Sequence, residues 1–302
     1  MLLRLFTVSR RVIEGSGFRV WRSRLSFVAS ATLVRRQLAD MLGDTGSFGR
    51  HLAKRPEVVG ALVWPYVSTS WDARQRLSLI REHFATLDNV LSKLDFDPDD
   101  VLILEDLCDL LPGLRVVLDQ PKWFMREGQL CLNIFVHDTR LFSLAFSFGA
   151  RPTLSAFIGA IQGRDIDGVL EVYKQITSAL HGMRPRDFLI EAFLCLCRTA
   201  GIERVYAVSD ANRHHRSSYF GRAPRAFSLN YDEVWRERGG SQQREDFFVL
   251  PIEGTKRDLS SVPSKRRSMY RKRYELMDRF EADIRKGLRD GFVKGHRDEF
   301  AN

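Results

Sequence analysis

The chain has 302 residues, of which 44% are hydrophobic and 11% aromatic, so it can bury a sizeable core and we expect a globular protein. Its 47 Lys and Arg against 38 Asp and Glu leave a net charge of +9, which favours an anionic partner without identifying one. No stretch reaches the roughly 20 consecutive apolar residues of a membrane span, which argues against an integral membrane protein.

Residues 1–38 form a basic segment with eight arginines and a single acid, Glu14. Its longest apolar stretch, residues 25–34, is short, contains serines and lacks a convincing cleavage site. We therefore predict no secretory signal and a cytoplasmic protein, a location that includes the periphery of the inner membrane. The four cysteines form no C-x-x-C pair, and we expect them to be small hydrophobic residues without disulfides.

Residues 22–111 show mostly helical spacing, with apolar residues three and four apart. Examples are Leu77, Ile80, Phe84 and Leu87. The Pro112–Gly113 pair then interrupts the pattern. We predict a mostly helical amino-terminal region at 1–115, an α/β domain at 116–290 and a tail at 291–302.

Two segments, 130–136 and 141–148, alternate their apolar side chains with a period of two, and residues 154–161 read as a third strand after a break at 149–152. In the first segment, Leu130, Leu132, Ile134 and Val136 share one face. The connections between the segments are short, so the pattern predicts an antiparallel meander.

Two helices and a further strand follow the meander. Residues 169–180 have helical spacing, and Gly182 stands where a helix ends on a left-handed residue. Pro185 predicts the start of the second helix, because its missing N–H would be unpaired at that position anyway. Ile202–Val208 then reads as a strand parallel to an earlier one, as a helical crossover requires.

The turn before Pro185 predicts an anion site, because free N–H groups, the positive end of the helix dipole and two arginines converge there. The residues of this site are His181, Gly182, Met183, Arg184 and Arg186. The alternative is structural: the arginines pair with Asp187 and Glu191, and His181 only packs. A second polar group, Ser209, Asp210 and Asn212, follows the strand 202–208, where open α/β sheets place ligands.

The carboxyl-terminal third predicts a short helix at Tyr231–Trp235 and a strand at 247–252. Tyr231 and Trp235 are four residues apart, so they form either a packed helix face or a catalytic pair. We predict no metal site at His214 and His215, because neighbouring side chains point apart and no carboxylate or cysteine stands at ligand spacing.

The segment 264–274 contains six cations and no acid: Lys265, Arg266, Arg267, Arg271, Lys272 and Arg273. Such a cluster suits an anionic membrane surface, an acidic partner or nucleic acid. The absence of a recognised reader motif argues against nucleic acid. The alternative is a solvated helix face whose charges pair with nearby acids.

Several ordered motifs together resemble the bacterial VirK/YbjX family over residues 50–290. They are Arg55-Pro56, Arg81-Glu82-His83-Phe84, Glu127-Gly128, Ile161-Gln162-Gly163, His181 to Pro185, Val208-Ser209-Asp210, Tyr231 to Trp235 and Lys265 to Tyr274. The resemblance implies a cytoplasmic protein of Gram-negative bacteria, linked to virulence and to tolerance of cationic antimicrobial peptides, whose biochemical activity is not established. The family usually has tyrosine where this chain has Phe84, which argues against a catalytic hydroxyl there.

The order of elements is similar to that of GNAT-type acyltransferases, and this second resemblance implies roles for individual residues. Gly182, Met183, Arg184 and Arg186 would hold the pyrophosphate of coenzyme A, with His181 beside them. Ser209 or Asn212 would orient the donor, and Tyr231 would protonate the leaving thiolate. Glu127 or Asp210 would deprotonate an attacking amine. The chain departs from the pattern because the helix 167–180 stands where a glycine-rich loop is expected.

The predicted fold is therefore α+β, with amino-terminal helices followed by a GNAT-like mixed sheet. Two hypotheses about function follow, and they belong to different classes of protein. One is an acyltransferase that moves an acyl group from coenzyme A or another thioester to an amine of an envelope precursor or small molecule. The other is a non-catalytic basic factor that acts at the inner-membrane surface or on a partner protein.

Overall fold

The computed structural model describes residues 2–221, 229–253 and 258–296, and its strands form one mixed sheet in the order β7-β8-β6-β5-β4-β3-β2-β1-β9. The strands are β1 (Asp100–Asp106), β2 (Leu114–Asp119), β3 (Leu130–Val136), β4 (Thr139–Gly149), β5 (Ser155–Gly163), β6 (Arg204–Val208), β7 (Ser241–Arg244), β8 (Phe247–Leu250) and β9 (Val293–His296). Among the described strands, β5 and β6 run parallel and every other neighbouring pair is antiparallel.

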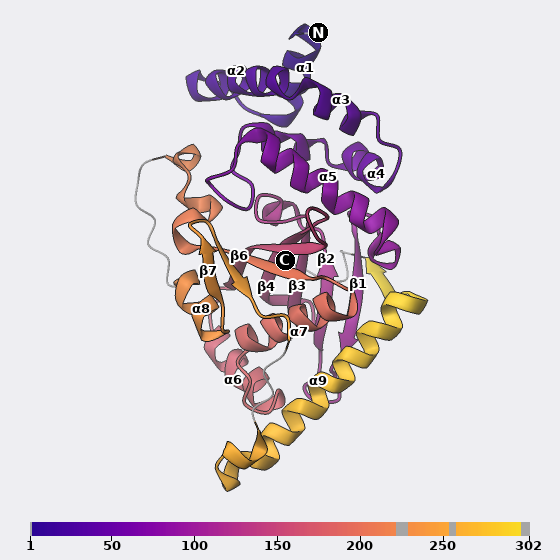
Figure 1. Cartoon of the computed structure of the whole chain (residues 1–302), viewed down its shortest axis with the longest axis vertical. Helices are drawn as coiled ribbons and strands as arrows, with labels where there is room; N and C mark the ends of the chain where they lie inside the picture. The colour runs from indigo at the N-terminus through magenta and orange to yellow at the C-terminus, as the bar shows by residue number, and fades with distance from the viewer. Residues whose placement is uncertain (1, 222–228, 254–257, 297–302) are drawn as a thin grey trace.

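Helices α1 to α5 precede the first strand, and α6 to α9 connect later strands (Figure 1). They are α1 (Leu2–Val12), α2 (Phe18–Leu33), α3 (Arg35–Leu42), α4 (Ser47–Lys54), α5 (Ala73–Asn89), α6 (Val169–Ala179), α7 (Pro185–Thr199), α8 (Tyr231–Glu237) and α9 (Ser264–Asp290). No helix in the described part of the chain is both long enough and apolar enough to cross a membrane.

The helix-covered face of the sheet holds the main core. Helix α7 packs on β3, β4 and β5, and α9 packs on α7 and β1. The rings of Phe146 in β4 and Phe193 in α7 are 4.7 Å apart, and Phe188 of α7 meets Phe280 of α9 at 6.1 Å. The alternation predicted for residues 130–136 is confirmed, since Leu130, Leu132 and Ile134 join this core while Cys131 and Phe135 lie on the other face.

The amino-terminal helices cover one end of the sheet through α5. This helix begins at a capping box formed by Asp72 and Gln75. The buried ring of His83 stacks on Phe148 of β4 at 5.7 Å, and the Phe148 N–H donates a hydrogen bond to His83 Nδ1 at 3.1 Å. Helices α1 to α4 then pack on each other, on α5 and on η1 (Pro56–Leu62).

The predicted α+β class, the meander, the helix start at Pro185 and the parallel strand after it are confirmed. Strand β1 nevertheless lies inside the range predicted to be mostly helical. Its residues 101–104 are all apolar, so the sequence shows no alternation by which to recognise a strand, and a bulge between Ile103 and Glu105 shifts its register. Strand β9, in the range predicted as a tail, pairs with β1, while residues 297–302 lie outside the described part of the chain.

Candidate functional site

The parallel strands β5 and β6 separate before β5 ends. Their pairing runs from Ser155 opposite Arg204 to Ile158 opposite Ala207, whereas β5 continues to Gly163. Beyond Ile158 the backbone of β5 loses its partner on the β6 side. The Tyr231 side chain replaces part of the lost backbone pairing, since its hydroxyl accepts a hydrogen bond from the Ile161 N–H at 3.1 Å.

Tyr231 is placed in this gap by the start of helix α8. Asn230 caps the helix by accepting hydrogen bonds from the N–H groups of Asp232 and Glu233. Burial raises the pKa of Tyr231 to about 12, against the opposing effects of the Ile161 N–H and the Arg213 guanidinium. The guanidinium lies 4.6 Å from the centre of the Tyr231 ring. Tyr231 therefore keeps its proton at neutral pH and is able to donate it.

Glu127 approaches the same stretch of β5 from the loop before β3. A Cβ atom at Gly159 would lie 1.9 Å from the Glu127 carbonyl oxygen, so this close approach requires glycine. The Glu127 side chain is 3% exposed, and its Oε2 atom has no hydrogen-bond partner among the described residues. Burial raises the pKa of Glu127 to about 8, with Arg126 opposing the shift. A carboxyl with such a pKa suits a general base near neutral pH.

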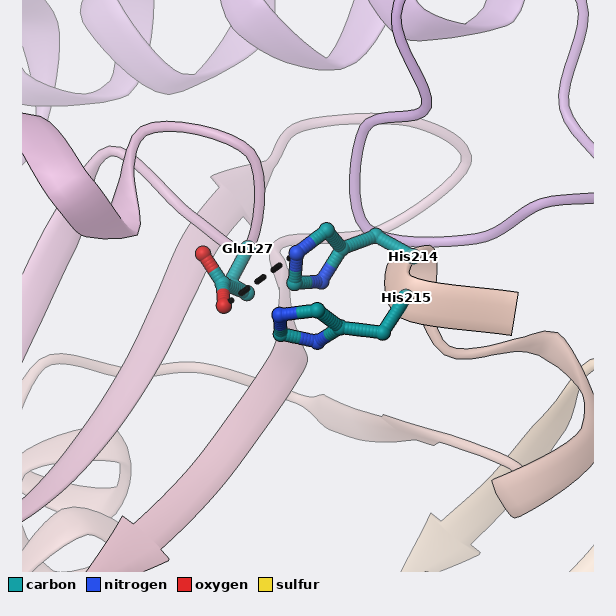
Figure 2. Close-up of side chains that lie close together, drawn as sticks. All are labelled: Glu127, His214 and His215. Atoms are coloured by element: carbon teal, nitrogen blue, oxygen red, sulfur yellow. Dashed lines mark ion pairs between the residues drawn. The ribbon is translucent and has the colours of Figure 1, made fainter. Parts of the chain in front are cut away.

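His214 and His215 turn both of their rings toward Glu127 (Figure 2). The His214 Nε2 atom lies 3.4 Å from Glu127 Oε1, and the centres of the two imidazole rings are 3.7 Å apart. Both residues belong to the short 3-10 turn η5 (His214–Arg216), and their rings nevertheless lie side by side. The expectation that they point apart is therefore wrong.

The three side chains offer ligand atoms that all lie within 4.8 Å of one another. Two imidazoles and one carboxylate form a donor set that suits Zn²⁺ or Fe²⁺, so this cluster could hold a divalent cation. The sequence argument against a metal missed it because Glu127 is distant in the chain. The fold supplies the carboxylate that was absent at local spacing.

Asp210 lies beside this cluster but its carboxylate is engaged. Its oxygens lie 2.6 Å from Arg216 and 3.4 Å from Arg213, and Oδ1 accepts a hydrogen bond from the Tyr231 N–H at 3.3 Å. These contacts fix the first residue of α8. Of the three predicted catalytic residues, Glu127 and Tyr231 thus border the gap directly, whereas Asp210 positions Tyr231.

Ser209 and Asn212 hold the loop after β6 against the turn at Glu245. The Ser209 hydroxyl donates to the Glu245 carbonyl at 3.1 Å, and the Asn212 amide donates to the Ser209 hydroxyl at 3.1 Å. Thr69 donates to the Asn212 side-chain oxygen at 3.3 Å. The predicted role of Ser209 and Asn212 in orienting a donor stays a prediction.

The start of α7 borders a largely apolar groove of about 730 Å³. Its lining includes Gly182, Arg184 and Arg186 at the helix start, and Phe142, Tyr173 and Leu229 opposite. Arg184 is exposed and forms no ion pair within the described residues. Arg186 instead pairs with Asp187 at 3.1 Å and Glu237 at 2.6 Å. The structural alternative predicted the partner Asp187, whereas its second predicted partner, Glu191, pairs with Arg238 at 3.1 Å.

The remaining residues of the predicted anion site contact α9. The Arg273 guanidinium donates to the His181 carbonyl at 2.6 Å, and a Cβ atom at Gly182 would lie 2.7 Å from that guanidinium. Met183 lines a neighbouring cavity of about 650 Å³. The groove and the Tyr231 gap are linked through Leu229, whose carbonyl accepts a hydrogen bond from Arg213 at 3.3 Å.

A family model described as "Protein of unknown function (DUF535)" matches residues 17–286. An uncharacterized protein of Haemophilus influenzae is 36% identical over 179 residues, which cover 59% of this chain and 59% of that protein. The alignment thus spans less than two thirds of the length of this relative.

Two further relatives have names. The "Uncharacterized protein YbjX" of Escherichia coli is 24% identical over 251 residues, covering 77% of this chain and 72% of that protein. The "Membrane protein LapB" of Mannheimia haemolytica is 25% identical over 158 residues, covering 52% and 68%. No solved structure matches the chain. The match over residues 17–286 shows that the chain belongs to the DUF535 family, which is the YbjX/VirK family of bacterial proteins.

Proposed function

We propose that this protein is an N-acyltransferase that takes its acyl group from coenzyme A or a similar thioester. The observation that supports this most is the separation of β5 from β6, with the Tyr231 hydroxyl and the loop of Glu127 both meeting the unpaired stretch. The groove at the start of α7 has the size of a cofactor site, and Arg184 at its edge is a cation without an ion-pair partner in the described chain.

The reaction assigns one proton transfer to each buried residue. The Glu127 carboxylate takes a proton from the acceptor amine, and the amine nitrogen attacks the thioester carbonyl carbon. The C–N bond forms as the C–S bond breaks, and the leaving thiolate takes the Tyr231 proton. The proton on Glu127 then returns to the tyrosinate, which restores both groups. Burial of both side chains keeps competing water away.

Isothermal titration with coenzyme A and acyl thioesters tests the donor site. We expect saturable binding that Arg184→Ala weakens by about 1 to 3 kcal/mol, the scale of a charge-assisted hydrogen bond. Lys93→Ala, on η2 (Ser92–Leu94) at the surface, is the matched control and should bind normally. Glu127→Gln should bind the thioester but transfer no acyl group to an amine. Absence of binding at millimolar thioester would refute the proposal.

The second candidate is a non-catalytic factor that binds an anionic surface or partner through the start of α9. Lys265, Arg266, Arg271 and Lys272 are exposed there and form no ion pair within the described residues. Arg267 and Arg273 are less available, since they donate to the carbonyls of Val262 at 2.9 Å and His181 at 2.6 Å. The links with virulence and with tolerance of cationic peptides stay predictions under either candidate.

A further inference from the structure

Helix α2 carries an exposed row of large apolar side chains, the apolar stripe, made of Phe18, Trp21, Leu25 and Leu33. Their exposed fractions are 75%, 52%, 43% and 79%. At about 100° per residue these positions fall within an arc of roughly 120° on one side of the helix. Phe27 and Ala31, on the opposite side, are fully buried. The helix thus has one apolar face in the core and a second one in solvent.

The carboxyl-terminal end of the stripe leads into a basic hollow. Leu33 lines a groove of about 680 Å³ together with Arg35, Arg36, Arg74, Arg81 and Arg151. Arg81 lies 4.0 Å from Asp40, but the other four arginines form no ion pair within residues 2–221, 229–253 and 258–296. The acid in the groove, Glu82, accepts a hydrogen bond from the Ala150 N–H at 2.9 Å. We call this groove the arginine groove.

An apolar row next to unpaired arginines has the chemistry of a membrane-interface surface. Trp and Phe side chains insert at the level of the lipid carbonyls, while guanidinium groups bind phosphate. We propose that this end of the molecule docks on a bilayer of anionic phospholipid, with the apolar stripe in the interface and a lipid phosphate in the arginine groove. A second copy of the chain fits less well, because an isologous contact here would bring the two arginine grooves together.

This surface differs from the basic cluster at the start of α9. In Figure 1 the helices α1 to α3 lie at one end of the long axis, and the first turns of α9 lie at the other. One flat membrane cannot contact both ends at once. The proposal also does not depend on acyl transfer, so the two can fail separately.

Vesicle flotation of the full chain tests the proposal. We expect binding to vesicles with about one-third phosphatidylglycerol to exceed binding to pure phosphatidylcholine at least about tenfold, and to weaken as salt rises. Phe18→Ser with Trp21→Ser should remove most of this binding. The triple variant Arg35→Gln, Arg36→Gln and Arg74→Gln should lose this roughly tenfold preference and bind anionic vesicles about as weakly as phosphatidylcholine vesicles.

Two control variants keep the experiment specific. Leu170→Ser changes a side chain of α6 that is 72% exposed, and it should leave vesicle binding unchanged. A variant with Lys265, Arg266, Arg271 and Lys272 all changed to Gln should also bind normally. Circular dichroism and thermal unfolding would confirm that every variant is folded.

Three results would overturn the proposal. The first is equal binding to anionic and zwitterionic vesicles, or no binding to either. The second is binding that only the α9 variant abolishes. The third is a dimer in light scattering that Phe18→Ser with Trp21→Ser dissociates, which would assign the stripe to a contact between copies.

Discussion

The Tyr231 hydroxyl accepts a hydrogen bond from the Ile161 N–H at 3.1 Å, next to the point where β5 and β6 cease to pair. This contact has two consequences. It gives a partner to a buried backbone donor that the sheet leaves unpaired, and it places a proton donor with a pKa raised to about 12 between two parallel strands. Structural and chemical roles of Tyr231 therefore need separate measurements.

Tyr231→Phe should lower the free energy of unfolding by about 1 to 3 kcal/mol, because the buried Ile161 N–H loses its acceptor. Urea unfolding measures this loss. Tyr206→Phe is the control, since the Tyr206 hydroxyl has no hydrogen bond within the described residues and should lose little. Thioester binding by the folded Tyr231→Phe protein should persist while transfer falls. Unchanged acyl transfer by Tyr231→Phe would show that Tyr231 takes no part in the reaction.

Asp210→Asn should distinguish a base from a positioning residue. The Asp210 carboxylate already pairs with Arg216 at 2.6 Å and Arg213 at 3.4 Å. Loss of its charge should lower the free energy of unfolding by about 1 to 2 kcal/mol without abolishing acyl transfer. Asp138→Asn, at the exposed turn between β3 and β4, is the control for stability. Full stability together with complete loss of transfer would instead make Asp210 the base.

Arg184 and Arg186 should differ in their effect on thioester binding, although the sequence suggested equal roles. Arg186 is held by Asp187 and Glu237, so its charge is largely compensated. We expect Arg184→Ala to weaken coenzyme A binding about tenfold, and Arg186→Ala to weaken it clearly less. Titration calorimetry of both variants measures the difference. A larger effect of Arg186→Ala would show that its acidic partners release it when the ligand binds.

The sequence predicted the parts of the fold that depend on local patterns. Alternation in residues 130–148 gave the meander, and Pro185 gave the start of α7, because both signals lie within a few neighbouring residues. Strand β1 was missed because its residues 101–104 are all apolar and show no alternation. The hairpin strand β7 was missed because all four of its side chains are exposed and polar.

The candidate site was predicted only in part, for a geometric reason. Glu127 and Tyr231 were found through the resemblance to GNAT-type acyltransferases, but the position of Glu127 depends on Gly159, whose lack of a Cβ lets the Glu127 loop touch β5. His214 and His215 reach Glu127 from the short turn η5, which follows β6 in the chain. Neither of these approaches leaves a periodic pattern in the sequence. Contacts between residues that are distant in the chain could therefore not be predicted.

Stability should fall in acid because of two buried histidines. Burial lowers the pKa of His83 to about 3 and that of His51 to about 4, whereas an unfolded histidine has a pKa near 6.5. The unfolded chain therefore binds protons first, and the contribution of each neutral ring is lost as pH falls from about 6.5 toward the folded pKa. Going from pH 7 to pH 4.5 should cost on the order of 2 kcal/mol for His83.

The variant His83→Gln tests this origin of the acid sensitivity. It should be less stable than the wild type at pH 7, since it loses the ring that accepts from the Phe148 N–H. Its loss of stability between pH 7 and pH 4.5 should nevertheless be smaller. His137→Gln, at an exposed turn, should keep the wild-type pH dependence. Urea unfolding at both pH values measures this difference. If His83→Gln loses as much stability between pH 7 and pH 4.5 as the wild type does, His83 is not the origin of the acid sensitivity.

The cluster of Glu127, His214 and His215 should bind a divalent cation, since its ligand atoms lie within 4.8 Å of one another. Titration with Co²⁺, followed by calorimetry and by the visible absorption of the bound ion, measures this directly. His215→Ala should weaken binding at least about tenfold, because even the loss of a group that only supports a metal ligand typically costs about 10- to 100-fold. His137→Ala is the control and should bind Co²⁺ as the wild type does. Because the cation would engage the carboxylate that acyl transfer needs free, transfer should decline as Co²⁺ binds. Equal Co²⁺ affinity in wild type and His215→Ala would show that the two histidines and Glu127 form a hydrogen-bonded cluster only.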